Sequence, residues 1–166
     1  QGGTLFTAAQ YADFVSRLEF QLPPAGNNGL AIRYPGTGDG SYSSFCELQI
    51  LDDGHPRYND PAYPKFYNLK PQQAHGSVYA RVAAHRGYLR PTGQWNFQET
   101  TVIGTTVKVE LNGFVILDVD VAKTDPTTYM YPIEKFKGRD LLQGHFGFLG
   151  HNDPVRFREI QIRQIK

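Results

Sequence analysis

The stretch 44–53 constrains the fold most strongly, because its side chains alternate between polar and apolar. Alternation of this kind indicates a β-strand with one buried face and one polar face. Glu47 and Gln49 fall on the polar side. The apolar side carries Cys46, Leu48 and Ile50. The pattern therefore places a carboxylate and an amide next to each other on a rigid sheet.

Two earlier stretches, 15–22 and 29–34, alternate in the same way. In the second stretch Arg33 falls on the polar side, so we expect it to face Glu47. Three strands with acids, amides and arginines on one face favour a sugar-binding surface. The side chains expected between the two sheets are Leu18, Phe20, Ile32, Leu48, Ile50, Val107 and Val109.

Length and composition indicate one globular domain spanning 1–166. The net charge is +1, without a basic run, which gives no reason to expect a nucleic acid or an anionic membrane as partner. No stretch reaches the roughly 20 apolar residues of a membrane span. A single cysteine excludes an internal disulfide, and its place on an apolar strand face predicts a buried, inert thiol. The chain starts at Gln1, which fits a mature or trimmed product.

Short alternating segments recur along most of the chain and predict an all-β, antiparallel sandwich of two sheets. One helical turn is expected over Thr7–Phe14. The dipeptide Asn112-Gly113 predicts a type I′ hairpin. Two long connections, 52–75 and 122–143, interrupt the pattern, and the aromatic first one is expected to form an ordered wall beside the polar face. The expected strands are 15–22, 29–34, 44–51, 77–83, 95–103, 106–111, 114–121, 144–149 and 155–165.

Several motifs occur in an order and spacing that resemble the 3-keto-disaccharide hydrolase family. They include Glu47-Leu48-Gln49-Ile50-Leu51-Asp52, Arg86-Gly87-Tyr88-Leu89-Arg90-Pro91, Gln94-Trp95-Asn96 and Gly147-Phe148-Leu149-Gly150-His151-Asn152-Asp153-Pro154. The resemblance implies a concanavalin-A-like, laminarinase-like jelly roll in a secreted or periplasmic bacterial protein. Many relatives carry Gln-Asp at the positions of Leu149-Gly150. This chain therefore lacks the carboxylate that those relatives have beside His151. Relatives also begin with further strand material upstream.

The resemblance further implies cleavage of glucosides already oxidised to a ketone at C3. That chemistry needs a base, an acid for the leaving oxygen and a group that polarises the ketone. Glu47, His151 and Arg33 are the candidate catalytic residues. A structural pair between Glu47 and Arg33 is the alternative for that position. The candidate substrate-binding residues are Gln49, Asn28, Tyr79, Trp95 and Asp52.

Three other readings stay open at this point. No metal or other cofactor is expected, although a divalent cation near Asp52, Asp53 and His55 can be imagined without a compact ligand spacing. A carbohydrate-binding module would use the same sheet face without catalysis. A structural, self-assembling domain would complete an unpaired sheet edge with a strand from another copy, giving an oligomer or filament.

Overall fold

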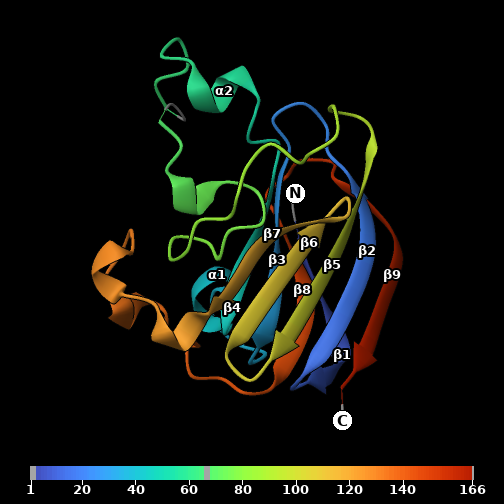
Figure 1. Cartoon of the computed structure of the whole chain (residues 1–166), viewed down its shortest axis with the longest axis vertical. Coiled ribbons are helices and arrows are strands. Elements are labelled where there is room, and N and C mark those ends of the chain that lie inside the picture. The colour runs from blue at the N-terminus through green and yellow to red at the C-terminus, as the bar shows by residue number, and fades with distance from the viewer. Residues whose placement is uncertain (1–2, 66–67, 166) are drawn as a thin grey trace.

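Two antiparallel sheets lie face to face in the computed structural model, which describes residues 3–65 and 68–165 (Figure 1). In order across the four-stranded sheet lie β1 (Thr4–Tyr11), β8 (Gly144–Gly150), β3 (Asn27–Tyr34) and β4 (Cys46–Leu51). The five-stranded sheet has the order β7 (Phe114–Asp120), β6 (Thr106–Leu111), β5 (Trp95–Ile103), β2 (Phe14–Gln21) and β9 (Arg156–Gln164). The predicted all-β jelly-roll sandwich is confirmed.

The helices are all short and lie in the connections. They are α1 (Gly40–Ser43), α2 (Pro56–Asn59) and the 3-10 turns η1 (Pro71–Gln73), η2 (Val121–Lys123), η3 (Pro126–Thr128) and η4 (Ile133–Lys135). None of the helices in the described ranges has the length and apolar character that crossing a membrane requires.

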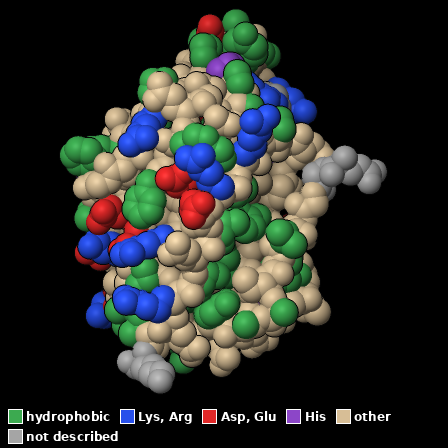
Figure 2. Space-filling model, turned by 90° about the vertical axis from the view of Figure 1, so that its right-hand side faces the viewer, with side chains coloured by type: hydrophobic (Ala, Val, Ile, Leu, Met, Phe, Trp, Pro, Cys, Tyr) green, Lys and Arg blue, Asp and Glu red, His purple; other side chains and the backbone are tan. Residues whose placement is uncertain are grey.

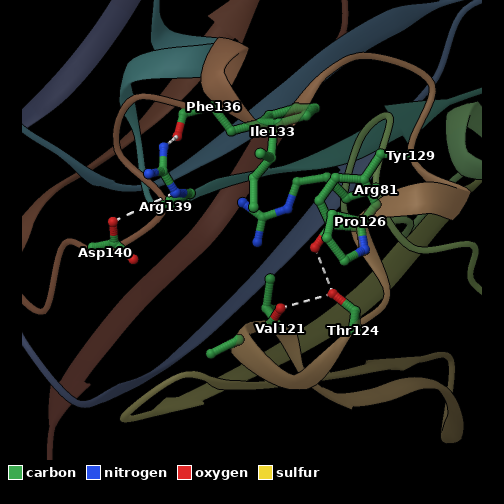
Figure 3. Close-up of a pocket in the computed structure, with 10 residues that line it drawn as sticks. Arg81, Val121, Thr124, Pro126, Tyr129, Ile133, Phe136, Arg139 and Asp140 are labelled. Carbon is green, nitrogen blue, oxygen red and sulfur yellow. Dashed lines mark hydrogen bonds and ion pairs between the residues drawn. The ribbon is translucent and has the colours of Figure 1, made fainter.

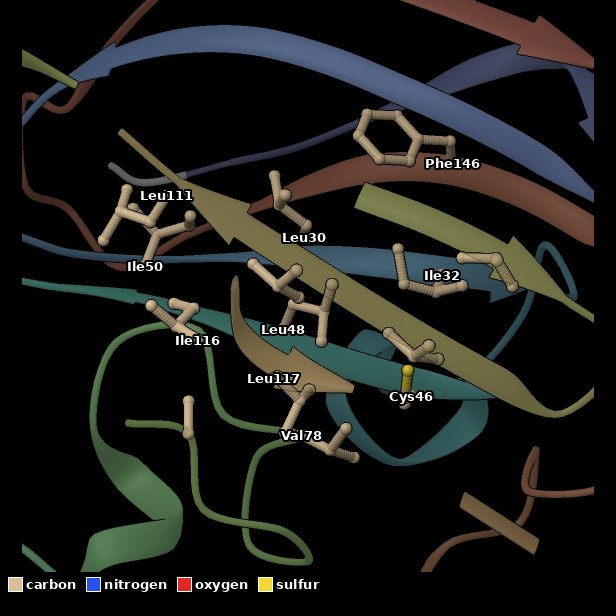
Figure 4. Packing of buried hydrophobic residues seen from close by; sticks show 14 of the residues in the cluster. Leu30, Ile32, Cys46, Leu48, Ile50, Val78, Leu111, Ile116, Leu117 and Phe146 are labelled. Atoms are coloured by element: carbon tan, nitrogen blue, oxygen red, sulfur yellow. The ribbon is translucent and has the colours of Figure 1, made fainter. Parts of the chain in front are cut away.

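The main core fills the space between the sheets and contains all seven side chains expected there. Figure 4 shows part of it, including Leu30, Ile32, Leu48 and Ile50 of the four-stranded sheet and Leu111 and Leu117 of the other sheet. Cys46 belongs to the same cluster, and burial raises the pKa of its thiol to about 12. The thiol is therefore protonated at neutral pH, as expected for an inert core cysteine.

The predicted hairpin turn joins β6 and β7. Asn112 and Gly113 have φ of 52° and 90°, the left-handed values that a type I′ turn requires at both central positions. Eight of the nine expected strands are present, and their ends differ from the expected ones by at most two residues. The ninth, 77–83, is wrong, because it forms only isolated bridges between Leu48 and Val78 and between Val78 and Val82.

The helical turn expected over Thr7–Phe14 is also wrong. Residues Thr4–Tyr11 form edge strand β1, which pairs with β8, and Phe14 begins β2. Apolar alternation is weak in β1 because, as an edge strand, it buries little of either face. Leu5 and Phe6 of this strand pair with Phe148 and Gly147 of β8 within the same chain. Self-assembly through an unpaired sheet edge stays a prediction.

Both long connections contact the four-stranded side of the molecule (Figure 1). The first is an ordered wall where Tyr58 packs with Ala25 and Leu51, whereas Tyr63 is exposed; Phe66 and Tyr67 lie outside the described residues. The second is tied down by the Met130 amide, which donates to the Ala80 carbonyl. Each connection lines one of the cavities described below.

The side of the molecule that includes β9 presents mixed charge. In the middle of the face in Figure 2, acidic side chains lie beside basic ones. On the five-stranded sheet Arg17 pairs with Glu99 and Arg158 with Glu19, all partly exposed. Screened pairs of this kind contribute little to stability.

Candidate functional site

Glu47 lies on the face of β4 that points away from the core, as its alternation with Leu48 predicts. The residue is only 3% exposed. Its carboxylate lies over Gly29 of β3, where any Cβ would overlap the carboxylate oxygens. A glycine at position 29 therefore makes the room in which the Glu47 side chain sits.

The surroundings of Glu47 favour its protonated form. Burial raises the pKa of this carboxyl to about 7; a hydrogen bond from the Ser41 side chain lowers it, and the nearby Asp39 carboxylate raises it. Within the described part of the chain, no basic side chain forms an ion pair with Glu47. A carboxyl with a pKa near neutrality can accept or release a proton under ordinary conditions.

The Glu47 side chain lines a cavity of about 220 Å³. The cavity is lined by Asn27, Asp39, Ser41, Tyr42, Glu47, Gln49, Tyr79 and His151. His151 is exposed, whereas Gln49 is buried and its Nε2 donates to Asn27 Oδ1 over 2.8 Å. Glu47, Gln49, Tyr79 and His151 were predicted as site residues, and the structure brings these four to one cavity.

A second cavity of about 250 Å³ adjoins the first, since Asn27, Gln49 and Tyr79 line both. Its outer wall comes from the first long connection, including Tyr58, Lys65 and Leu69. The two cavities thus lie next to each other along β4, since Glu47 and Gln49 line the first and Gln49 and Leu51 line the second.

Tyr42 and Tyr79 line the Glu47 cavity, and Tyr131 packs against Tyr42. The Tyr42 ring lies 6.5 Å from that of Tyr79 and 6.1 Å from that of Tyr131, between ring centres. Burial raises the pKa of Tyr42 to about 12 and also raises that of Tyr79. Both phenols are therefore protonated at neutral pH and can donate hydrogen bonds to a ligand oxygen.

Arg33 does not face Glu47, which corrects the expected placement. The pairing of β3 with β8 shifts register between Ala31 and Tyr34, and Arg33 has φ of 55°. This bulge turns the side chain into the core side of the sheet, where it is fully buried and lies over the Phe45 ring. Its guanidinium donates to three backbone carbonyls and to Asp13.

Three of the predicted substrate-binding residues lie outside the Glu47 cavity. Asn28 is buried on the core-facing side of β3, where its Oδ1 accepts from Gly29 N. Trp95 belongs to the other sheet, with the Arg158 guanidinium 4.0 Å above its ring. Asp52 accepts hydrogen bonds from Ala25 N and Thr92 Oγ1. Each of these side chains contributes to the packing or bonding of its own element.

The side chains considered for a cation site make contacts within the protein instead. His55 Nδ1 accepts from Arg57 N and caps α2, while Asp53 accepts from His75 N and pairs with Arg86. Burial lowers the pKa of His75 to about 3, so that its imidazole is neutral. Over the described ranges 3–65 and 68–165, no group of three or more His, Cys, Asp or Glu side chains could hold a metal ion.

Four cavity residues were not predicted: Asn27, Asp39, Ser41 and Tyr42. Asn27 was recognisable, because it alternates in phase with Gly29 and Ala31, whereas Asn28 is in phase with Leu30. Asp39 caps α1 by accepting from Ser41 N, a spacing common at helix starts. Only the tertiary fold places that short helix over Glu47.

Solved structures with the same fold include two proteins of Parabacteroides distasonis, each named "putative glycosyl hydrolase". The first has a TM-score of 0.80 at 23% identity, covering 99% of this chain and 84% of its own. The second has a TM-score of 0.80 at 20% identity, covering 98% and 74%. The carbohydrate binding module CBM66 of Bacillus subtilis has a TM-score of 0.60 at 10% identity, covering 98% and 82%. At such identities these likenesses show the fold alone.

The comparison with curated proteins found no match. The family model described as a 3-keto-alpha-glucoside-1,2-lyase-like domain matches residues 1–163, nearly the full length of the chain. The chain belongs to this 3-keto-alpha-glucoside-1,2-lyase-like family.

Proposed function

We propose that the chain cleaves glucosides that carry a ketone at C3, with Glu47 as the general base. The observation that carries the proposal is the buried Glu47 carboxyl, whose pKa is raised to about 7 at the floor of a polar cavity. Family membership supports the substrate class. A base with this pKa suits removal of a proton made acidic by a neighbouring ketone.

The proposed reaction is an elimination. Glu47 takes the proton from C2, the C–H electron pair forms the C1–C2 double bond through the C3 enolate, and the bond from C1 to the leaving oxygen breaks. The leaving oxygen takes up a proton, and water can then add across the double bond. The proton on Glu47 returns to solvent or to the leaving group, so the enzyme is regenerated.

Other cavity residues supply the remaining roles. His151, exposed and lining the same cavity, is the proposed acid for the leaving oxygen. Tyr42 and Tyr79, which burial keeps protonated, are the proposed donors to the ketone oxygen in place of Arg33. Gln49 and Asn27 are placed to bind sugar hydroxyls. We further propose a secreted or periplasmic location in a bacterium.

Non-catalytic carbohydrate binding is the second candidate function. It is favoured by the ring cluster of Tyr42, Tyr79 and Tyr131, since aromatic rings beside polar groups suit sugar recognition. Both functions would use the same cavity. They differ in whether the Glu47 proton takes part.

The test is turnover of a 3-keto-glucoside compared with its unoxidised parent. We expect turnover of the keto-sugar alone, and a loss of ~100-fold or more in Glu47→Gln with binding retained. Glu134→Gln, an exposed carboxylate on η4, is the matched control and should keep full activity. Binding without turnover of any keto-sugar would favour the second function, and unchanged turnover in a folded Glu47→Gln protein would remove Glu47 from the mechanism.

A further inference from the structure

A separate cavity of about 190 Å³ lies where the connection 121–140 folds back over Arg81. None of its lining residues lines the Glu47 cavity. In Figure 3 the Arg81 guanidinium occupies the middle of this space, with Val121, Thr124, Ile133, Phe136 and Arg139 around it. The proposed cleavage of glucosides does not involve this cavity around Arg81.

Arg81 carries a buried charge without a counter-ion. The residue is 4% exposed, and within the described ranges no carboxylate lies within 4.0 Å of its nitrogen atoms. Its Nη1 donates to the Phe45 carbonyl over 3.0 Å, whereas its buried Nε has no hydrogen-bond partner among those residues. A buried, unsatisfied donor on a charged group is costly, so its persistence calls for an explanation.

Aromatic rings hold the guanidinium in place. The guanidinium carbon lies 5.4 Å from the ring centre of Phe136, 5.7 Å from that of Tyr129 and 6.0 Å from that of Phe45. These contacts offset part of the cost of burial and fix the plane of the group. Among the described residues, no acceptor is paired with its Nε–Nη2 edge, and this is an edge that binds a carboxylate through two parallel hydrogen bonds.

The backbone before Arg81 is held in an unfavourable conformation. Ala80 has φ of 60°, a left-handed value that costs a non-glycine residue about 1 kcal/mol or more. Ala80 is held there from both sides, because its amide donates to Gln72 and its carbonyl accepts from Met130. The strained residue thus directs Arg81 toward the segment that closes the cavity.

The other charged residues that line the cavity are Arg139 and Asp140, which carry opposite charges. Arg139 lines the wall and donates to the Phe136 carbonyl, while its Nε lies 3.5 Å from the Asp140 carboxylate. The Asp140 side chain is 84% exposed, so water screens its charge. Val121, Pro126 and Ile133 provide apolar wall. The cavity therefore combines one buried cation with apolar surface.

We propose that this cavity binds a small organic carboxylate, with the carboxylate on the Nε–Nη2 edge of Arg81 and a short aliphatic part against Val121 and Ile133. The volume equals that of about six waters, which suits an acid of a few carbon atoms. The guanidinium edge fits a carboxylate or a phosphate, and the apolar wall favours an acid that carries an aliphatic part over inorganic phosphate.

The experiment titrates the full chain with sodium propionate, acetate or phosphate, with sodium chloride at matched ionic strength as reference. NMR shifts and intermolecular contacts from the propionate methyl group report affinity and location. We expect saturable propionate binding with contacts to the Tyr129 and Phe136 rings. Arg81→Met should weaken the binding at least ~10-fold, as loss of a charge-assisted hydrogen bond predicts. Arg17→Gln, which changes an exposed arginine of the other sheet, should leave it unchanged.

Several outcomes would overturn the proposal. These are absence of saturable binding, equal affinity in a folded Arg81→Met protein, tighter binding of phosphate than of propionate, and propionate contacts outside the cavity. If Arg81→Met does not fold, the location of the contacts in the parent protein decides, and Arg139→Gln should weaken binding about threefold because it removes the second positive charge.

Discussion

Arg33 and Glu47 are both ionisable residues buried on neighbouring strands, yet their surroundings differ. Arg33 on β3 is enclosed by the carbonyls of Ala12, Gly104 and Leu141 and by the Asp13 carboxylate. Glu47 on β4 has a hydroxyl hydrogen bond and a neighbouring carboxylate, with a cavity beside it. Burial alone does not separate a structural residue from a functional one.

The two side chains differ in how many of their hydrogen-bonding atoms are paired with other groups of the protein. Nε, Nη1 and Nη2 of Arg33 all donate to protein oxygens that belong to different loops, so the side chain ties those loops together. Glu47 keeps acceptor capacity directed into the cavity and a pKa of about 7. A satisfied buried charge indicates structure, and an incompletely satisfied one beside a cavity indicates a site.

The largest expected effect is on Arg33. We expect Arg33→Met to lower the free energy of unfolding by about 3 kcal/mol, because it leaves the Asp13 charge and several loop carbonyls without their donor. Urea unfolding measures this change. Turnover per folded molecule should not change, since Arg33 lies outside the Glu47 cavity. The control is Arg17→Met, whose partly exposed pair with Glu99 should cost less than ~1 kcal/mol. Equal losses of unfolding free energy in Arg33→Met and Arg17→Met would contradict the structural role assigned to Arg33.

The pH dependence of stability tests Glu47. Its ordinary pKa of 4.5 applies to the unfolded chain, and its folded pKa is about 7. Between these values the folded protein holds a proton that the unfolded chain has released, so this group makes stability fall as the pH rises from 4.5 to 7. The loss approaches about 3 kcal/mol and is absent below pH 4.5.

Glu47→Gln should lack this loss, so its stability advantage over the parent should grow through that pH window. Parallel unfolding curves at several pH values measure the difference. Glu134→Gln removes an exposed carboxylate and should track the parent closely. A constant difference between Glu47→Gln and the parent would show that the pKa of Glu47 is the same in the folded and the unfolded protein.

Gly29→Ala should have an intermediate effect. The new Cβ would overlap the Glu47 carboxylate, which must then leave its place over β3. We expect a loss of about 2 kcal/mol in unfolding free energy, typical of overpacking, together with lower turnover. Gly54→Ala is the control, because a Cβ at that position meets no atom within 4 Å. Normal turnover in Gly29→Ala would mean that the carboxylate position is not needed.

The smallest effect is expected for Asp13→Asn. The Asp13 side chain is 39% exposed, and an amide oxygen can still accept from Arg33 and Gly104. The cost should be at most about 1 kcal/mol and should shrink at high salt. A cost as large as that of Arg33→Met would mean that the ion pair, and not the loop carbonyls, holds Arg33.

The sequence predicts the parts of this molecule that depend on local alternation. Leu48 and Ile50 face the core and Glu47 and Gln49 face away because a period of two is built into strand geometry. The Asn112-Gly113 turn follows from its backbone requirements. Glu47, His151 and Tyr79, which the sequence singles out as candidate site residues, line one cavity.

The parts that could not be predicted depend on irregular backbone and on distant contacts. A bulge reverses the side of Arg33, and no local pattern marks the register shift that produces it. The edge strand β1 buries too little to show alternation. Asp39 and Ser41 reach Glu47 only because Gly40 packs against Leu149 of β8, a contact across more than a hundred residues.

The reactivity of the Cys46 thiol can report how often strand β4 separates from the opposite sheet. Cys46 precedes Glu47 on β4, faces the core and is the lone cysteine of the chain. A thiol reagent can reach its sulfur only when the sheets separate at β4, so the labelling rate under native conditions measures how often that happens. The strand that carries the proposed base can thus be followed without introducing a probe, and ligands that stabilise the Glu47 cavity should slow the labelling in proportion to their occupancy.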